Sequence, residues 1–151
     1  MKVIVDTSVW SLALRREGRN SPPGKNVETG ESRELRKLIT EGNVAIIGPI
    51  RQELLSGIRE PAQFERVRAK LASFRDVNIE TGDYETAAAF FNRCRTNGIQ
   101  GSNTDFLICA LAVRKDLPIL TTDGDFTLFK KHLPIVLHKV RDVHISNIRS
   151  H

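Results

Sequence analysis

Residues 2–10 read Lys2-Val-Ile-Val-Asp-Thr-Ser-Val-Trp10, and the expected fold starts from this stretch. The run from Val3 to Val5 is short, apolar and β-branched, which predicts a strand. Asp6 ends the run, and the residues that follow have helical character. A strand that passes directly into a helix is typical of an α/β fold, and here an acidic side chain stands at the point of change.

Apolar runs and helical patterns keep alternating along the rest of the chain. Val44-Ala-Ile-Ile47 is apolar throughout, as expected for a strand that a parallel sheet buries on both faces. The pattern predicts strands at 2–5, 44–47, 77–79, 118–122 and 135–137. It predicts a helix N-capped by Ser32, and further helices at 50–58, 61–74, 81–97, 103–113 and 126–132. This order predicts an α/β three-layer αβα sandwich around a central, mainly parallel five-stranded sheet.

The length of 151 residues suits one domain, so we expect a single domain over 1–151. The segment 16–31 is polar and rich in Gly, Pro, Asn and Ser, which predicts an exposed, flexible loop. Asp6 interrupts the apolar start of the chain, and no apolar run is long enough to span a bilayer. We therefore expect a cytoplasmic protein with no membrane partner.

The overall charge is positive, with a formal net charge of +5 and a pI of about 9.6. A polyanionic partner fits this balance, and ordinary solubilising charge explains it as well. Cys94 and Cys109 fall inside predicted helices among apolar neighbours and are expected to be reduced core residues. The histidines lack the i, i+4 spacing that places two zinc ligands on one helix face.

Four acidic residues stand where a predicted strand gives way to a helix or where a helix begins: Asp6, Glu53, Asp105 and Asp123. In an open parallel sheet these points line one crevice, so the four carboxylates are expected to converge. Two carboxylates about 4 Å apart repel by roughly 4 kcal/mol at an effective dielectric near 20, so such a group protonates or recruits cations. Singly, each acid suits a helix cap or an exposed helix position. The joint pattern favours a metal site.

A site made of carboxylates suits Mg²⁺ or Mn²⁺, because these ions prefer oxygen ligands and keep several waters. Such a shell leaves room for a phosphate oxygen, and a bound ion can generate an attacking hydroxide or stabilise a leaving oxygen. The sequence contains no Walker loop and no GxGxxG or GxSxG motif. These features together predict hydrolysis of a phosphodiester.

Four fragments occur in the order and approximate spacing of a known family. They are Asp6-Thr-Ser-Val-Trp10, Gln52-Glu-Leu-Leu-Ser-Gly57, Asn103-Thr-Asp-Phe-Leu-Ile-Cys-Ala110 and Leu120-Thr-Thr-Asp-Gly-Asp-Phe126. Together they resemble a PIN-domain ribonuclease, and most of all the VapC-type toxins of bacterial toxin-antitoxin pairs. The resemblance extends over nearly the whole chain.

The resemblance implies a Mg²⁺- or Mn²⁺-dependent endoribonuclease that cuts structured RNA, such as a transfer RNA or a ribosomal RNA loop. It also implies a homodimer, silenced by a cognate antitoxin that lies across the groove near the active site. The implied catalytic metal ligands are Asp6, Glu53, Asp105 and Asp123, with Asp125 as an auxiliary acid and Ser8 and Thr121 in support. The apolar helix stripe from Phe64 to Phe74 is a candidate for the antitoxin contact, although core packing explains it as well.

Basic residues are needed to bring an RNA to an acidic site. The candidates are Arg15 and Arg16 near the end of the first helix and Lys130 and Lys131 late in the chain. Contacts of this kind hold phosphates without reading sequence, and a solvated basic face explains the same residues. Aromatic residues are few, so recognition of RNA shape is expected rather than stacking on single-stranded bases.

Three other interpretations stay open. A housekeeping PIN nuclease in RNA processing would have the same fold and acids. A receiver-like signalling module also holds Mg²⁺ with aspartates, but here Val44-Ala-Ile-Ile47 runs into Gly48-Pro49 without a phospho-accepting Asp. A non-catalytic RNA- or antitoxin-binding scaffold would tolerate loss of the acids, and all four are present.

Overall fold

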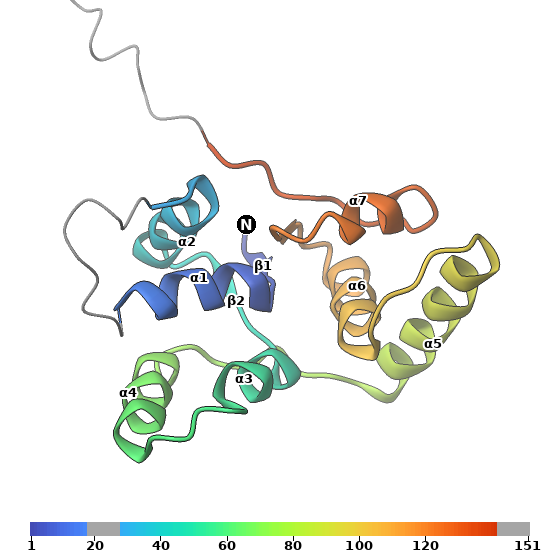
Figure 1. Ribbon diagram of the computed structural model, residues 1–151. Helices are drawn as coiled ribbons and strands as arrows, with labels where there is room; N and C mark the ends of the chain where they lie inside the picture. Colours follow the sequence, from blue (N-terminus) through green and yellow to red (C-terminus); the bar gives the residue numbers. More distant parts are fainter. Residues whose placement is uncertain (18–27, 142–151) are drawn as a thin grey trace, which may run out of the picture.

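In the computed structural model, which describes residues 1–17 and 28–141, the strands are separated by runs of two or more helices (Figure 1), so the strict alternation of strands and helices expected from the sequence is not found in these ranges. The strands within these ranges are β1 (Val3–Val5), β2 (Val44–Ala45) and β3 (Ile119–Leu120). The helices within them are α1 (Thr7–Glu17), α2 (Gly30–Glu41), α3 (Gly48–Leu55), α4 (Pro61–Leu71), α5 (Thr81–Thr96), α6 (Asn103–Lys115) and α7 (Asp125–Lys130). None of these helices has both the length and the apolar character needed to cross a membrane.

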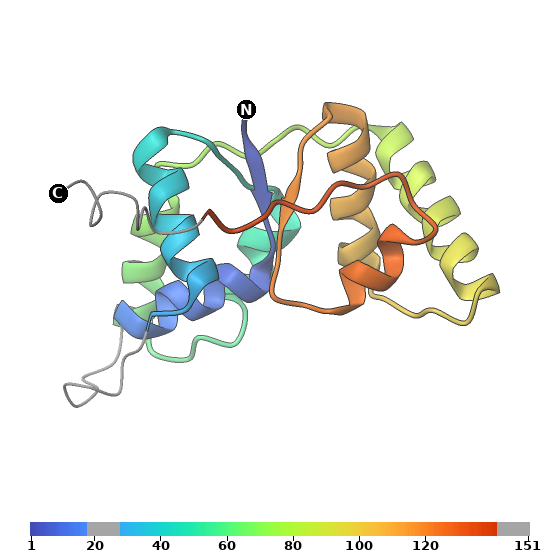
Figure 2. The same ribbon diagram turned by 90° about the horizontal axis from the view of Figure 1, so that it is seen from above.

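The strands form a parallel sheet in the order β2-β1-β3. Val3 of β1 is in register with Val44 of β2, and Ile4 is in register with Ile119 of β3. Helices α1, α2 and α4 lie on one side of this sheet and α5, α6 and α7 on the other (Figures 1 and 2). All three residues of β1 are buried, as an apolar run that is covered on both faces requires.

The expected five-stranded sheet is wrong for the described residues, where the sheet has three strands. The segments predicted as the third and fifth strands run beside the sheet but do not form strands. Asp76, just before the third segment, makes one parallel bridge with Ile46, and Leu137 in the fifth makes one with Ile119. On the β2 side, helix α3 begins at Gly48, directly after the predicted strand 44–47. Between β2 and the start of α3, the chain is extended over too few residues for a second bridge to the segment after Asp76. The parallel arrangement itself is confirmed.

The start of α2 also differs from the expectation. Thr29, rather than Ser32, is the N-cap, since its hydroxyl oxygen accepts a hydrogen bond from the Ser32 backbone N–H at 3.0 Å. Residues 16–17 continue α1 and residues 30–31 open α2, so the loop expected at 16–31 is shorter at both ends. Its centre, residues 18–27, lies outside the described residues.

Gly101, just before α6, lies against the aromatic part of the core. A Cβ atom at this position would be 2.6 Å from Cζ of Phe129 and 3.0 Å from Cε2 of Phe106. Both rings are buried, and their centroids are 4.8 Å apart, so neither has room to move away.

We therefore expect Gly101→Ala to lower the free energy of unfolding by about 1–3 kcal/mol, the usual cost of overpacking a core. Chemical denaturation monitored by circular dichroism measures this change. Gly82→Ala is the matched control, because nothing lies within 4 Å of its Cβ and it sits inside α5, where Ala is the better helix former. Equal stabilities for Gly101→Ala and the unchanged protein would contradict the packing described here.

Two fully buried carboxylates away from the sheet edge are neutralised by arginines. Asp83 accepts hydrogen bonds from Arg114 at 2.7 and 2.9 Å. Glu34 on α2 is 0% exposed, lies 2.6 Å from His138 Nε2, and accepts a 2.7 Å bond from Arg141 Nε. The contacts of Glu34 with His138 and Arg141 connect the chain after β3 to α2. In both cases a buried negative charge has a cationic partner, as buried charges usually do.

Candidate active site

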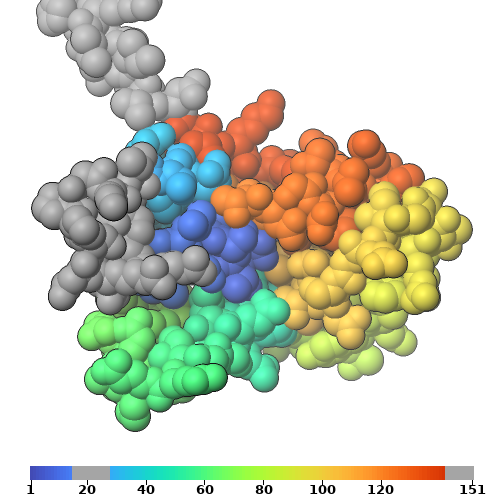
Figure 3. Space-filling view, viewed as in Figure 1, coloured from blue at the N-terminus to red at the C-terminus, as the bar shows by residue number. Residues whose placement is uncertain are grey.

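A cleft of about 660 Å³ opens at the carboxyl end of β1. All four acids singled out from the sequence line it: Asp6, Glu53, Asp105 and Asp123. Figure 2 shows β1 running from the amino terminus to the edge of the molecule where α1 begins. Figure 3 is viewed from that edge, where the surfaces of the blue chain start, the blue-green α3, the gold start of α6 and the orange residues after β3 meet. Segments distant in sequence therefore place their acids around one cleft.

Asp6 is held by the sheet and by two hydroxyl groups. Its backbone N–H donates to the carbonyl of Leu120 at 2.9 Å, which ties it to the end of β3. Its Oδ2 accepts hydrogen bonds from the hydroxyls of Ser8 and Thr121, both at 2.8 Å. The side chain is only 6% exposed. These contacts leave Oδ1 as the oxygen that is free to bind a ligand in the cleft.

Asp123 and Glu53 are oriented by similar local contacts. The backbone N–H of Asp123 donates to Thr121 Oγ1, and Asp123 Oδ1 accepts from the backbone N–H of Asp125, each at 2.9 Å. Glu53 lies in the second turn of α3, and its Oε1 accepts a 2.8 Å hydrogen bond from the Thr7 hydroxyl. Each carboxylate thus uses one oxygen for support and keeps the other available.

Asp105 is the third residue of α6 and part of its capping box. Its Oδ2 accepts from the backbone N–H of Ser102 at 2.9 Å, and its own N–H donates to Ser102 Oγ at 3.1 Å. Burial raises the pKa of Asp105 above its ordinary value, and the charges of Asp6 and Asp123 raise it further, while the bonds with Ser102 only partly offset these effects. Asp105 therefore lies close enough to Asp6 and Asp123 to be affected by their charges.

Among the side chains that the structure describes, no cation pairs with the acids of this cleft. In residues 1–14 and 28–141, none of the four acids forms an ion pair with Lys, Arg or His. Asp83 and Glu34 differ from them in this respect, since each has an arginine. A group of carboxylates without an internal counter-charge is an environment that attracts an external cation.

The acids do not form a closed metal cage. Over the described ranges, no three His, Cys, Asp or Glu side chains stand in an arrangement that would hold an ion by themselves. Mg²⁺ seldom uses such a cage, because it keeps several waters and is usually held by one or two carboxylates together with phosphate oxygens. Hard oxygen donors around an open cleft therefore fit Mg²⁺ or Mn²⁺.

Comparison with known proteins places the chain in a family. A family model described as PIN domain matches residues 3–131. The chain belongs to the PIN-domain family.

Several characterised proteins are similar to this PIN domain. The VapC ribonuclease Mb1587 of Mycobacterium bovis and the ribonuclease VapC11 of Mycobacterium tuberculosis are both 26% identical to it over 133 residues, which cover 85% of this chain and 92% of each relative. Two solved structures have 16% identity and share its fold: VapBC2 from Rickettsia felis bound to a promoter DNA fragment, and FitAcB from Neisseria gonorrhoeae. Their TM-scores are 0.69 and 0.64, and both cover 91% of this chain, with 98% and 96% of their own chains.

Three other residues that the sequence suggested, Asp125, Lys130 and Lys131, do not line the cleft of this PIN domain. Asp125 supplies a backbone N–H to Asp123, and its exposed side chain is not among the lining groups. Lys130 and Lys131 are exposed at the end of α7. Arg15 and Arg16 belong to the last turns of α1, whose rise of about 1.5 Å per residue carries them about 12 Å from its first residue. Their side chains lie outside the described part of the chain.

Five residues that the sequence did not single out as site residues also line the cleft: Thr7, Pro49, Gln52, Ser56 and Thr104. Thr7, Gln52 and Thr104 adjoin the predicted acids, and Ser56 lies within the same quoted fragment as Glu53. Adjacency in the motif was the available signal. It does not show which neighbour faces the cleft, because that depends on where each helix begins.

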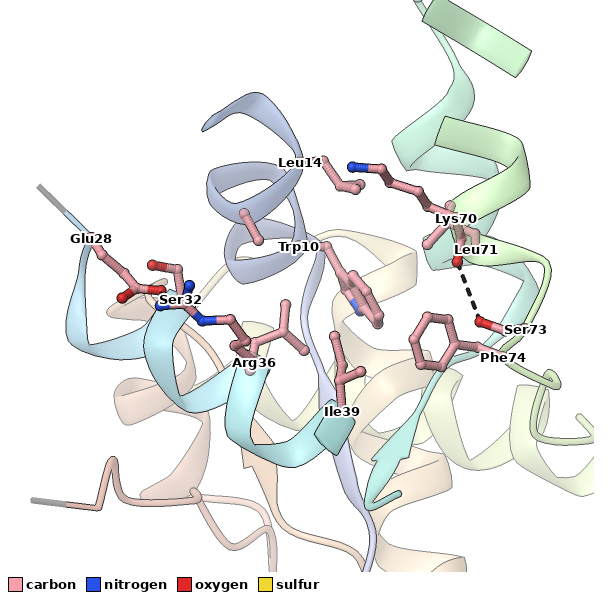
Figure 4. Close-up of a pocket in the computed structure, with 12 residues that line it drawn as sticks. Trp10, Leu14, Glu28, Ser32, Arg36, Ile39, Lys70, Leu71, Ser73 and Phe74 are labelled. Atoms are coloured by element: carbon pink, nitrogen blue, oxygen red, sulfur yellow. Dashed lines mark hydrogen bonds and ion pairs between the residues drawn. The ribbon is translucent and has the colours of Figure 1, made fainter. Parts of the chain in front are cut away.

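A second hollow, of about 480 Å³, lies between α1, α2 and the end of α4, away from the acids (Figure 4). The rings of Trp10 and Phe74 meet edge to face in it, with centroids 5.3 Å apart. Glu28 and Arg36 line it beside α2, and Lys70 lines it from α4 on the opposite side. Of the stripe from Phe64 to Phe74, Val67 and Leu71 are buried, and Phe64 is exposed. Core packing therefore explains the centre of the stripe, and Phe74 lines a surface hollow.

Proposed function

We propose that this PIN domain is a Mg²⁺- or Mn²⁺-dependent endoribonuclease that hydrolyses phosphodiester bonds in structured RNA, and that it is the toxin of a toxin-antitoxin pair. The observation that carries the proposal is the cleft that four carboxylates line, with no cationic partner among the side chains that the structure describes. The names of the mycobacterial relatives, which are ribonucleases, support the same reaction.

Asp6, Glu53, Asp105 and Asp123 would hold the metal. When bound, such an ion lowers the pKa of a coordinated water and stabilises negative charge on the leaving oxygen. The chain's own contribution is to fix the donors beforehand. Ser8 and Thr121 hold Asp6, Thr7 holds Glu53, and the capping box of α6 holds Asp105. Ligands held in this way pay little reorganisation cost when the substrate arrives.

The basic remainder of the surface would bring the RNA in. The net charge is +5 although the cleft itself is negative, so the positive charge lies elsewhere on the surface. Lys130 and Lys131 are exposed at the end of α7, which follows the segment that carries Asp123. Contacts of lysine with phosphates give affinity that is independent of sequence and falls with salt.

The partner would be a cognate antitoxin protein. The fold neighbours from Rickettsia felis and Neisseria gonorrhoeae, and a toxin-antitoxin complex from Klebsiella pneumoniae with a TM-score of 0.56 and 22% identity that covers 83% of this chain and 90% of its own, share this architecture. The hollow around Trp10 and Phe74 is a candidate binding site for part of the antitoxin. A homodimer in the cytoplasm completes the proposal.

Purified protein incubated with total RNA tests the reaction. We expect new 5′ ends at a small number of positions, no cleavage in excess EDTA, and recovery when Mn²⁺ or Mg²⁺ is added back, because the carboxylates cannot activate water alone. Sequencing of the new 5′ ends measures both the activity and its target. Equal cleavage with EDTA would contradict the metal requirement, and RNA binding without any cleavage would favour a non-catalytic scaffold.

A further inference from the structure

A third hollow adjoins the acidic cleft. Its volume is about 430 Å³, and it lies between the start of α3, one face of α5 and the start of α6. It shares Pro49 and Thr104 with the cleft. The remaining lining residues are Tyr84, Ala87, Ala88, Phe91, Asn92, Asn103 and Leu107. A group bound here would lie next to whatever the carboxylates hold.

The walls of this hollow combine apolar surface with free amides. Ala87 and Leu107 are buried beneath it, and the ring of Tyr84 is 57% exposed at its side. Asn92 and Asn103 are exposed, and over the described residues their side-chain amides make no hydrogen bond. An apolar wall, one exposed ring and two unpaired amides match a planar group with polar edges.

We propose that this hollow binds one base of the RNA, next to the phosphate that is cut. This inference rests on the proposed nuclease function. Nucleobases have apolar faces that stack on aromatic rings, and their edges carry donors and acceptors that an amide can pair with. The hollow is within the size range of small-ligand sites. Tyr84 supplies the ring, and Asn92 and Asn103 supply the edge contacts, so the protein reads a base as well as the RNA's shape.

A second copy of the chain is the competing occupant of this face. A stable interface buries about 1,200–2,000 Å² in total and has an apolar centre. Among the residues that line the hollow, Tyr84 is the single large hydrophobic side chain that is exposed. Its neighbours at the surface are alanine and asparagine. The continuity with the cleft therefore favours the base.

The protein offers a direct probe, because Tyr84 is its only tyrosine. Incorporation of 3-fluorotyrosine gives one ¹⁹F resonance that reports on the hollow. EDTA is added so that nothing is cut. We expect short oligoribonucleotides that carry bases to shift this resonance, and an abasic oligomer of equal length to leave it in place. A resonance that no oligonucleotide moves, in a preparation that cuts RNA after Mn²⁺ is added, would overturn the base site and leave the nuclease standing. A resonance that moves with protein concentration alone would assign the face to a second copy.

Substitution gives a second, kinetic test. Tyr84→Ala is expected to raise KM for RNA cleavage about tenfold with little change in kcat, since one stacked base is lost. Tyr84→Phe keeps the ring and should restore most of the affinity. Val136→Ala is the matched control, because Val136 is 59% exposed but does not line the hollow. An unchanged KM for Tyr84→Ala would refute the site.

Discussion

Replacement of Asp6 by Asn is expected to lower the rate of RNA cleavage at least about a hundredfold without unfolding the protein. Asn has nearly the same shape, and its side-chain oxygen still accepts hydrogen bonds from Ser8 and Thr121. What it lacks is the charge that attracts a divalent cation. Initial rates on one defined RNA measure the loss, and far-ultraviolet circular dichroism checks the fold.

Two further variants make this result specific. Asp105→Asn keeps the capping-box acceptor for Ser102, so it should lose activity in the same way and stay folded. Asp116→Asn is the matched control, since Asp116 is exposed, ends α6 in a left-handed conformation that Asn tolerates, and does not line the cleft. If Asp6→Asn cut RNA as fast as Asp116→Asn, the carboxylate could not be a metal ligand.

The largest effect on stability is expected at Glu34. Burial raises the pKa of its carboxyl, but hydrogen bonds from His138 and Arg141 outweigh this and hold the pKa below its ordinary value of 4.5. Glu34→Gln removes the buried charged acceptor of His138 and of Arg141, and leaves Arg141 only its ion pair with the exposed Glu41. We expect it to lower the free energy of unfolding by about 2–3 kcal/mol at neutral pH and the melting temperature by about 5–10 °C. Arg141 is partly exposed and can turn to water, which limits the cost.

The same pair predicts how stability depends on pH. A carboxyl with a lowered pKa in the folded state contributes stability above its unfolded pKa and loses it as the pH falls through the folded value. The difference in the free energy of unfolding between the unchanged protein and Glu34→Gln should therefore be largest at pH 7 and become smaller below about pH 4.5. Glu41→Gln, an exposed partner of the same Arg141, is the control and should change stability little. A difference that stayed constant from pH 7 to pH 3 would argue against the ion pair.

Much of the fold was predictable because buried parallel strands consist of consecutive apolar residues, which are visible in the sequence. Val3 to Val5 and Val44 to Ile47 contain such runs, and helices follow them with recognisable starts. The number of strands was not predictable, because the segments 77–79 and 135–137 show the same apolar character as true strands, but the chain pairs with the sheet there through one residue only, Asp76 and Leu137. The N-cap of α2 was misplaced for a similar reason. Thr29 and Ser32 are both good caps, and the hydrogen bond between them shows that Thr29 precedes the helix.

The acids of the candidate site were predictable because three of them follow a strand or open a helix and Glu53 lies one turn into a helix that follows a strand, and the topology of a parallel sheet brings these points together. The hydroxyls that orient them were partly predictable, since Ser8 and Thr121 stand two residues from an acid in the quoted fragments. The link from Thr7 to Glu53 joins residues 46 positions apart and depends on the packing of α1 against α3. The hollow at Tyr84 depends on the contact of three helices and has no local sequence signal.

Binding of Mn²⁺ to the protein without RNA tests the central claim most directly. Electron paramagnetic resonance distinguishes free from bound Mn²⁺, so it can be titrated into the unchanged protein, Asp6→Asn and Asp116→Asn. We expect the unchanged protein and Asp116→Asn to bind with equal affinity, and Asp6→Asn to bind at least about tenfold more weakly. Equal affinity in all three proteins, or no binding in any of them, would contradict a metal site formed by the carboxylates of the cleft.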